Sequence, residues 1–241
     1  MILLFTDFGR EGPYVGELHA VLARAAPAVR VIDLMHDAPR FRPELAAYLL
    51  AALVERLRPG EVVVAVVDPG VGGERAPVIL EADGVTLTGP DNGLLEIVRR
   101  RARVARARRI EWRPERLSAS FHGRDLFAPV AAALARGEPV AASPFELTPQ
   151  PRWPDDLPAI IHVDGFGNLV TGLRASTLPD DRRVRFHSKK LRRGRTFGDV
   201  EYGQALVYPN SLGLLEIAVN QGSAAETFEL GLGDPVEIGP A

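Results

Sequence analysis

Apolar and polar positions in the N-terminal part of the chain alternate between two patterns. Short runs of mostly β-branched residues predict strands at 2–5, 29–34 and 61–67. Between them, apolar residues recur at helical spacing and predict helices at 15–26 and 43–57. Strands that alternate with helices favour parallel pairing. We therefore expect an α/β domain with a mostly parallel sheet flanked by helices.

Turn residues and prolines mark the limits of this domain. Asp83 and Gly84 separate the apolar runs 78–82 and 85–88 and predict a hairpin. The alanine-rich stretch 124–139 predicts a closing helix. The segment that follows is rich in proline and has no periodicity, which is typical of a linker. We expect the domain to cover residues 1–145 and the linker to cover 146–157.

The C-terminal part has only short alternating runs between turn signals. This spacing predicts a smaller all-β domain over residues 158–241, barrel-like in form or a sandwich. The runs are 159–164, 168–172, 182–187, 204–209, 214–219 and 235–239. We interpret the basic cluster 187–195 as a solvated hairpin rather than a nucleic-acid patch.

Composition and charge narrow the classes of function. Apolar residues make up 46% of the 241 positions and charged residues 25%, as in ordinary globular proteins. The formal net charge of −2 gives no general attraction to nucleic acid or to a membrane surface, so a small-molecule partner is expected. Zero cysteines exclude disulfides and thiolate zinc sites. The first apolar run is too short for a signal peptide or a membrane span, and we expect a cytoplasmic protein.

Polar residues follow the predicted parallel strands at their carboxyl ends, where α/β proteins bind ligands. Asp7 follows the first strand, and Asp68 follows the third within a glycine-rich loop. The loop 89–93 follows the apolar run that ends at residue 88, and a fourth loop, 120–125, presents His122 just ahead of the predicted helix. Each feature alone also fits an ordinary turn or helix cap. Their combination indicates a site.

The sequence carries no common cofactor motif. Its histidines lack paired ligand spacing, with no HxH or HExxH, and neither GxGxxG after the first strand nor a P-loop occurs. We therefore expect no metal and no bound dinucleotide or triphosphate. One metal-based alternative stays open, because Asp7, Asp68 and Asp91 could supply hard oxygen ligands to a metal-dependent phosphohydrolase.

Six motifs together resemble the S-adenosyl-L-methionine (SAM) hydrolase family, also called SAM hydroxide adenosyltransferase, in the superfamily of the SAM-dependent chlorinase and fluorinase. In chain order they are TDFG with YVG (6–16), VVDPGVGGER (66–75), GPDNG (89–93), SFHGRD (120–125), DGFGN (164–168) and NSLGLLEIAVNQGSAA (210–225). The resemblance implies an α/β N-terminal domain, a barrel-like C-terminal domain, and a homotrimer with active sites at subunit interfaces. It also implies hydrolysis of SAM to adenosine and L-methionine by attack of water on ribose C5′. SAM is then the substrate, and no cofactor is needed.

By motif position, the resemblance assigns catalysis to Asp68, Arg75 and His122. The chemistry is consistent with this set, because the sulfonium of SAM leaves as a neutral thioether and only water needs activation. A carboxylate can orient or deprotonate water, and a guanidinium can stabilise hydroxide-like character. The imidazole can complete a hydrogen-bonded relay or hold the water in line. The resemblance also implies substrate-binding residues. Asp7 would bind the ribose diol, and Asp164 and Ser211 the methionine end. Phe8 would also contact the substrate, and the residues around adenine would be Phe166, Asn168, Phe197 and Asn220.

Two further alternatives concern the same fold. A SAM-dependent halogenase would use a halide, which needs no base and is repelled by a carboxylate such as Asp68. A non-catalytic SAM- or adenosine-binding protein would have no need of a water-activating set. The presence of Asp68, Arg75 and His122 favours hydrolysis over both.

Overall fold

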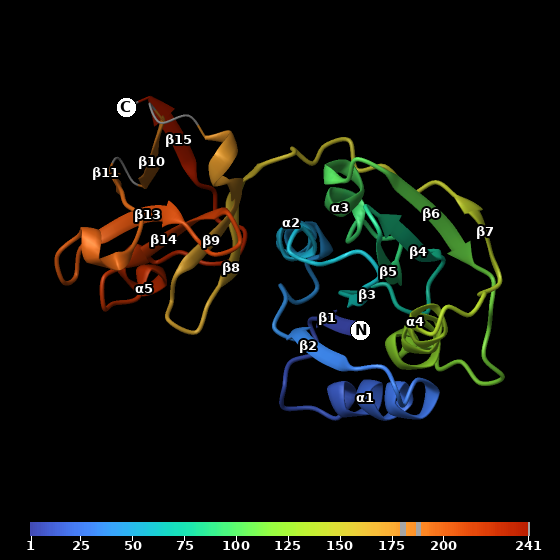
Figure 1. Cartoon of the computed structure of the whole chain (residues 1–241). Helices are drawn as coiled ribbons and strands as arrows, with labels where there is room; N and C mark the ends of the chain where they lie inside the picture. The colour runs from blue at the N-terminus through green and yellow to red at the C-terminus, as the bar shows by residue number, and fades with distance from the viewer. Residues whose placement is uncertain (179–181, 187–188, 241) are drawn as a thin grey trace. The chain divides into compact units, whose positions relative to one another are not determined.

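The computed structural model describes residues 1–178, 182–186 and 189–240 (Figure 1). The chain divides into two compact units, Met1–Arg152 and Trp153–Ala241. The division falls inside segment 146–157, where the sequence predicts a linker. Within these described ranges, no helix has the length and apolar character needed to cross a membrane.

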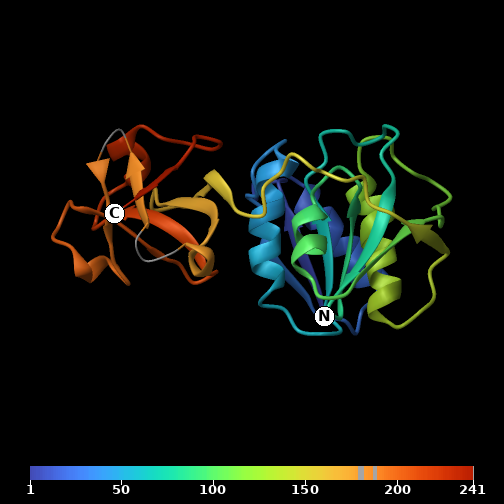
Figure 2. The same ribbon diagram turned by 90° about the horizontal axis from the view of Figure 1, so that it is seen from above.

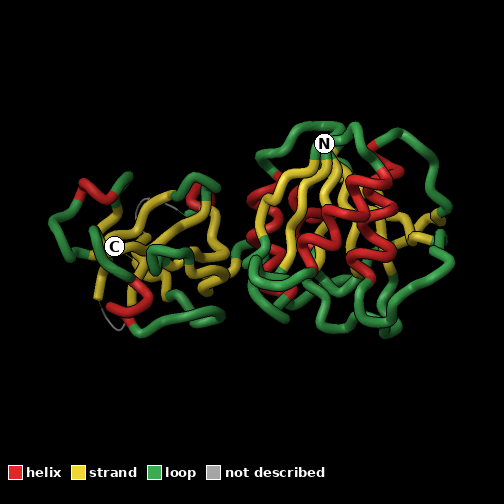
Figure 3. Tube along the Cα trace, turned by 90° about the horizontal axis from the view of Figure 1, so that it is seen from below, coloured by secondary structure: helices red, strands yellow, loops and turns green. Residues whose placement is uncertain are grey.

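The first unit is a seven-stranded sheet in the order β2-β1-β3-β5-β4-β6-β7. Its strands are β1 (Ile2–Thr6), β2 (Val31–Met35), β3 (Val62–Val66), β4 (Pro77–Ala82), β5 (Val85–Pro90), β6 (Ala105–Ile110) and β7 (Ala142–Phe145). Its helices are α1 (Tyr14–Ala25), α2 (Pro43–Val54), α3 (Glu96–Arg101), a π-helical turn (Gly123–Phe127) and α4 (Ala128–Ala135). Helices α1 and α4 lie on one face of the sheet, and α2 and α3 lie on the other (Figure 1). Helices cover the strands in the views from above (Figure 2) and from below (Figure 3).

The α/β class is confirmed, but the sheet is mixed rather than mostly parallel. Strands β2, β1, β3 and β5 pair in parallel, whereas β4, β6 and β7 are added by antiparallel pairing. The chain reverses at the predicted turn between β4 and β5, where Asp83 and Gly84 both have positive φ, 47° and 89°.

The apolar pattern does not predict β6 or β7. In β6, arginines take the place of an apolar run, because most of its positions are only partly buried or exposed. Strand β7 lies at the end of the predicted domain 1–145, directly before the predicted linker 146–157.

The centre of the sheet holds the two most buried strands of the unit. Every residue of β1 and β3 is buried, because helices cover both faces. Ile2, Leu4 and Val64 pack in one cluster with side chains of α1 and α4, and burying each such side chain contributes about 1.5–3 kcal/mol. Thr6 pairs with Val66 at the carboxyl ends of the two strands, so the loops that leave them start at the same edge of the sheet.

The second unit is built from strands, as predicted, and its described residues form two separate sheets and not a closed barrel. One sheet has five strands in the order β12-β13-β14-β9-β8, and the other has three in the order β11-β10-β15. The elements are β8 (Leu157–Val163), β9 (Leu169–Arg174), a 3-10 turn (Ala175–Thr177), β10 (Arg182–Phe186), β11 (Lys189–Lys190), β12 (Arg192–Arg193), a 3-10 turn (Phe197–Asp199), β13 (Ala205–Pro209), β14 (Leu214–Val219), α5 (Ala224–Phe228) and β15 (Glu237–Pro240).

Each of the six predicted runs of the second unit corresponds to a strand. Alternation and turn spacing predict strands, but they do not specify whether a sheet closes on itself. In the basic cluster, residues 187 and 188 lie outside the described residues, and β11 pairs antiparallel with β10.

Candidate active site

One pocket of about 450 Å³ lies in the first unit, a volume that suits a small molecule. Asp7 after β1, Asp68 after β3 and His122 before the π-helical turn all line it. These residues come from three separate loops. The structure therefore brings together the side chains that the strand-end argument and the motifs single out.

Asp68 and Arg75 form a buried ion pair at this pocket. Arg75 Nε donates to Asp68 Oδ1 at 3.0 Å and to Oδ2 at 2.9 Å, and Arg75 Nη2 also donates to Oδ2. The side chains of Asp68 and Arg75 are only 3% and 10% exposed. The guanidinium also lies over the ring of Phe127, 5.7 Å from its centroid. A carboxylate held at both oxygens by a planar cation has a fixed orientation.

His122 is joined to the same pair. Arg75 Nη2 lies 2.9 Å from His122 Nδ1. A guanidinium can only donate, so Nδ1 accepts and the ring proton of the neutral imidazole is on Nε2. Burial lowers the pKa of His122, and the charge of Arg75 lowers it further, although Asp68 opposes the shift. The ring is therefore neutral at pH 7 and offers Nε2–H as a donor.

We expect the imidazole of His122 to titrate below its ordinary pKa of 6.5 and to carry its proton on Nε2 at pH 7. Long-range ¹H–¹⁵N spectra over a pH series measure both properties. Because folding lowers this pKa, the neutral ring contributes stability above about pH 6.5, and the contribution is lost as the pH falls through the folded value. A proton on Nδ1 at pH 7 would contradict the arrangement.

Gly72 explains how the loop of Asp68 and Arg75 meets the loop of His122. Its φ is +79°, and a Cβ on it would lie 2.3 Å from the carbonyl oxygen of Ala119. The main chain can approach the neighbouring loop this closely only without a side chain. The glycine signal in the sequence thus reflects, at this position, contact between two loops.

Asp7 lines the pocket beside Asp68. Its Oδ2 accepts a hydrogen bond from the backbone N–H of Phe41 at 3.1 Å. Burial raises the pKa of Asp7, and the nearby Asp68 carboxylate adds to this shift, while the Phe41 N–H opposes it. Asp7 is therefore a carboxylate whose charge is only partly balanced by its surroundings.

Sequence reasoning identified Phe8 but missed the other aromatic residues of this pocket. Phe8, Tyr14 and Phe121 contact one another with ring centroids 5.3–5.9 Å apart. Phe41 also lines the pocket, is 72% exposed, and has a left-handed φ of 58° that is uncommon for a bulky residue. Nothing in its sequence context signals this conformation.

The loop after β5 supports the site without lining the pocket. Asn92 Nδ2 donates to the carbonyl oxygen of Val67, directly before Asp68, at 2.9 Å. Asp91 instead binds Thr148, accepting from its backbone N–H at 3.1 Å and from its hydroxyl at 2.7 Å.

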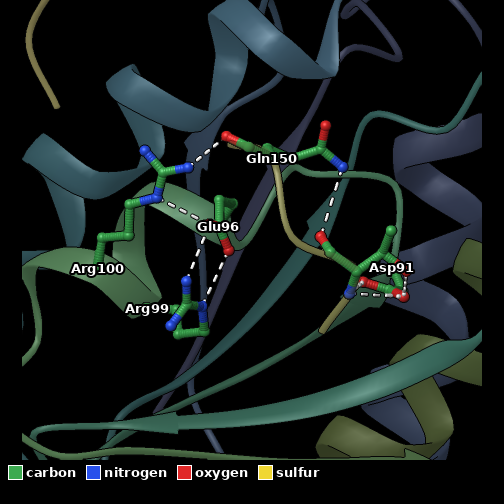
Figure 4. Close-up of polar contacts among 6 residues, drawn as sticks. Asp91, Glu96, Arg99, Arg100 and Gln150 are labelled. Carbon is green, nitrogen blue, oxygen red and sulfur yellow. Dashed lines mark hydrogen bonds and ion pairs between the residues drawn. The ribbon is translucent and has the colours of Figure 1, made fainter. Parts of the chain in front are cut away.

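Figure 4 shows Asp91 beside a second polar group, in which Glu96 accepts hydrogen bonds from Arg99 and Arg100, and Arg100 donates to the carbonyl oxygen of Gln150. Asp91 thus helps to hold the segment after β7. The three aspartates of the metal-based alternative do not meet, and no group of three potential His, Asp or Glu ligands forms among the described residues.

A second pocket of about 460 Å³ lies in the second unit. All four residues expected around adenine line it: Phe166, Asn168, Phe197 and Asn220. Phe166 is 81% exposed, whereas Asn168 is buried. An exposed aromatic ring in a largely apolar pocket can stack on a flat ligand.

The two residues expected at the methionine end do not line either pocket. Asp164 orders the turn of Phe166 and Asn168, since its Oδ1 accepts from both backbone N–H groups at 2.9 Å. Ser211 lies in the exposed turn between β13 and β14. Their contact with substrate stays a prediction.

Fold and site together define a two-unit α/β protein with a buried carboxylate, guanidinium and imidazole at a small-molecule pocket. Models of the SAM hydroxide adenosyltransferase N-terminal and C-terminal domains match residues 2–143 and 158–237. The chain belongs to the SAM hydroxide adenosyltransferase family.

Relatives and solved structures agree with this assignment. The chain is 39% identical to a protein of Salinispora arenicola named (R)-S-adenosyl-L-methionine hydrolase, over 97% of this chain and 95% of that one. It is 38% identical to a protein of the same name from Thermus thermophilus, over 98% of both chains. A crystal structure of a conserved protein from Thermotoga maritima superposes with a TM-score of 0.87 at 34% identity, over 99% of this chain and 100% of that one.

Proposed function

We propose that this protein hydrolyses SAM to adenosine and L-methionine by attack of water on ribose C5′. The observation that carries the proposal is the hydrogen-bonded set of Asp68, Arg75 and His122, which joins a buried carboxylate to a small-molecule pocket. Relatives named SAM hydrolase, at 38–39% identity over nearly the whole chain, support it.

The roles of the three side chains follow from their hydrogen bonds. The sulfonium leaves as a neutral thioether, so catalysis has to increase the nucleophilicity of water. Asp68 Oδ1 accepts only one donor from Arg75 and keeps a lone pair for a water proton, whereas Oδ2 accepts two. Accepting that proton contributes about 10²–10⁴-fold in rate. In this arrangement His122 donates through Nε2–H and orients the water, while Arg75 holds the carboxylate and stabilises negative charge.

Substrate binding is divided between the two pockets in this proposal. In the first unit, Asp7 accepts hydrogen bonds from the ribose diol, and the aromatic rings of Phe8 and Phe41 lie near the sulfonium cation. In the second unit, Phe166 and Phe197 stack on adenine. Asn168 and Asn220 form hydrogen bonds with the polar edge of adenine. Asp164 and Ser211 bind the methionine end of SAM.

We also propose that the protein is a homotrimer in which neighbouring subunits complete each active site. The support is the family resemblance and the distribution of the expected residues over two pockets, one in each unit. Light scattering at micromolar concentration should give the mass of three chains. A monomer that retains full turnover at every concentration would contradict this assembly.

Incubation with SAM in ¹⁸O-labelled water, followed by mass analysis of the nucleoside, tests the reaction. We expect adenosine labelled at the 5′ oxygen, one methionine for each adenosine, and no loss of rate in chelator. If 5′-chloro-5′-deoxyadenosine were the main product in chloride buffer, the protein would be a halogenase and not a hydrolase. Stoichiometric binding of SAM without turnover would indicate a non-catalytic binding protein.

Phe166→Ala is expected to weaken adenosine binding at least fivefold, because stacking a base on an aromatic ring contributes about 1–3 kcal/mol. Isothermal titration with adenosine measures the change. Tyr202→Ala is the matched control, since Tyr202 is also an aromatic residue of the second unit, is 75% exposed, and does not line the pocket. Equal losses in both variants would contradict a stacking role.

A further inference from the structure

A buried polar group beside the first pocket has no role in the proposed chemistry. Thr6 Oγ1 lies 2.7 Å from His36 Nδ1, and both residues are at most 1% exposed. His36 Nε2 lies 3.1 Å from Asp33 Oδ1, close enough for an ion pair but without the geometry of a hydrogen bond. His19 Nε2 binds the same carboxylate oxygen from the solvent side, at 2.6 Å. A polar chain thus runs from a half-exposed surface histidine to the end of β1.

The order threonine, histidine, aspartate is also that of a hydrolytic triad, but its position excludes that role. Thr6 is completely buried, so no substrate carbonyl can reach its oxygen. The same oxygen accepts a hydrogen bond from the backbone N–H of Phe8 at 3.3 Å. The Thr6 hydroxyl therefore contacts the main chain at Phe8, the residue after Asp7. This contact indicates that the polar group has a structural role at Asp7.

Backbone hydrogen bonds join segment 6–9, which contains Asp7, to segment 36–41. The backbone of Gly9 donates to the carbonyl oxygen of His36 at 2.7 Å, and that of Ala38 donates to the carbonyl oxygen of Thr6 at 3.1 Å. The bond from Phe41 N–H to Asp7 Oδ2 belongs to the same pairing of segments. The Thr6–His36 contact is the buried side-chain link among these bonds. Since Asp7 lies between Thr6 and Phe8, its carboxylate depends on both anchors.

We propose that Thr6, His36 and Asp33 form a positioning relay that holds Asp7 and Phe41 in place for nucleoside binding. The inference rests on the proposed function for the identity of the ligand. The carboxylate of Asp33 attracts the imidazole electrostatically from the surface, the imidazole orients the Thr6 hydroxyl, and the hydroxyl fixes the main chain at Phe8. A shift of Asp7 by a fraction of an ångström would lengthen its contacts with the ribose and with Phe41.

Thr6→Val tests the relay, because valine keeps the shape of threonine and removes the hydroxyl. We expect the Kd of adenosine and the KM of SAM to rise at least tenfold while kcat changes less than threefold. Thr6→Ser restores the hydroxyl and should restore both constants. The matched control is Thr88→Val, in which an equally buried threonine of β5 loses its hydroxyl. It should leave adenosine affinity unchanged.

A second readout does not depend on the substrate. In Thr6→Val, hydrogen exchange at the backbone amides of Gly9 and Phe41 should accelerate at least tenfold, and in Thr6→Ser it should not. Asp33→Asn, a change at a half-exposed residue, should act in the same direction and keeps the test available if Thr6→Val does not fold. If the wild type did not turn over SAM, the proposed function would be wrong, but the hydrogen-exchange measurement would still test the relay. Unchanged exchange in both variants, or a loss in kcat alone, would overturn the relay.

Discussion

Asp68→Asn is expected to reduce SAM turnover by about 10²–10⁴-fold, the contribution typical of a positioned proton acceptor, while adenosine binding changes less than threefold. Asparagine has the shape of aspartate, but its amide cannot take a proton from water. Its single oxygen can still accept from Arg75, which donates three hydrogen bonds to the carboxylate in the wild type. Single-turnover assays with chromatographic detection of adenosine measure the effect.

The control for Asp68→Asn is Asp156→Asn. Asp156 also accepts a bidentate contact from an arginine, with Arg174 Nε and Nη2 both at 2.8 Å, and it lines neither pocket. The same chemical change there should leave turnover within about twofold. If Asp68→Asn retains more than a tenth of wild-type turnover, another group accepts the proton, and the assignment of Asp68 fails.

Much of the first unit could be predicted because its signals are local. The valines of β3 are buried on both faces, and a parallel strand of this kind places the next polar residue, Asp68, at the ligand-binding edge of the sheet. Arg75 follows within the same loop, so the Asp68–Arg75 pair needs no long-range information. His122 comes from a distant segment, and only its motif associated it with the other two.

What could not be predicted depends on the route of the chain in space. Asp91 has the sequence context of a site residue, yet it binds Thr148 because the segment after β7 passes beside it. Phe41, whose φ is left-handed, donates its backbone N–H to Asp7, a residue 34 positions earlier in the chain. The polar relay at Thr6 joins residues of β1, of β2 and of the loop after β2, and no spacing rule connects them.

The destabilising effect of Arg75→Met should be among the largest of any single substitution in this chain. It leaves the carboxylate of Asp68, a side chain only 3% exposed, without its cation. Breaking a buried ion pair in this way costs about 3–5 kcal/mol. Methionine is of similar length and can pack on Phe127, so lost volume contributes little. Denaturant unfolding at pH 7 measures the change, and turnover should fall with it.

The double variant Asp68→Asn with Arg75→Met separates the buried charge from other causes. If the cost arises from an unpaired carboxylate, the double variant regains most of the stability, and the two substitutions are strongly non-additive. Arg174→Met is the matched control, because its pair with Asp156 is 21–30% exposed and should lose about 1 kcal/mol or less. Additive losses in the double variant would mean that Arg75 stabilises the protein by packing and not by balancing Asp68. Asp68 would then be held for chemistry by its loop, with the guanidinium acting only on the reacting water.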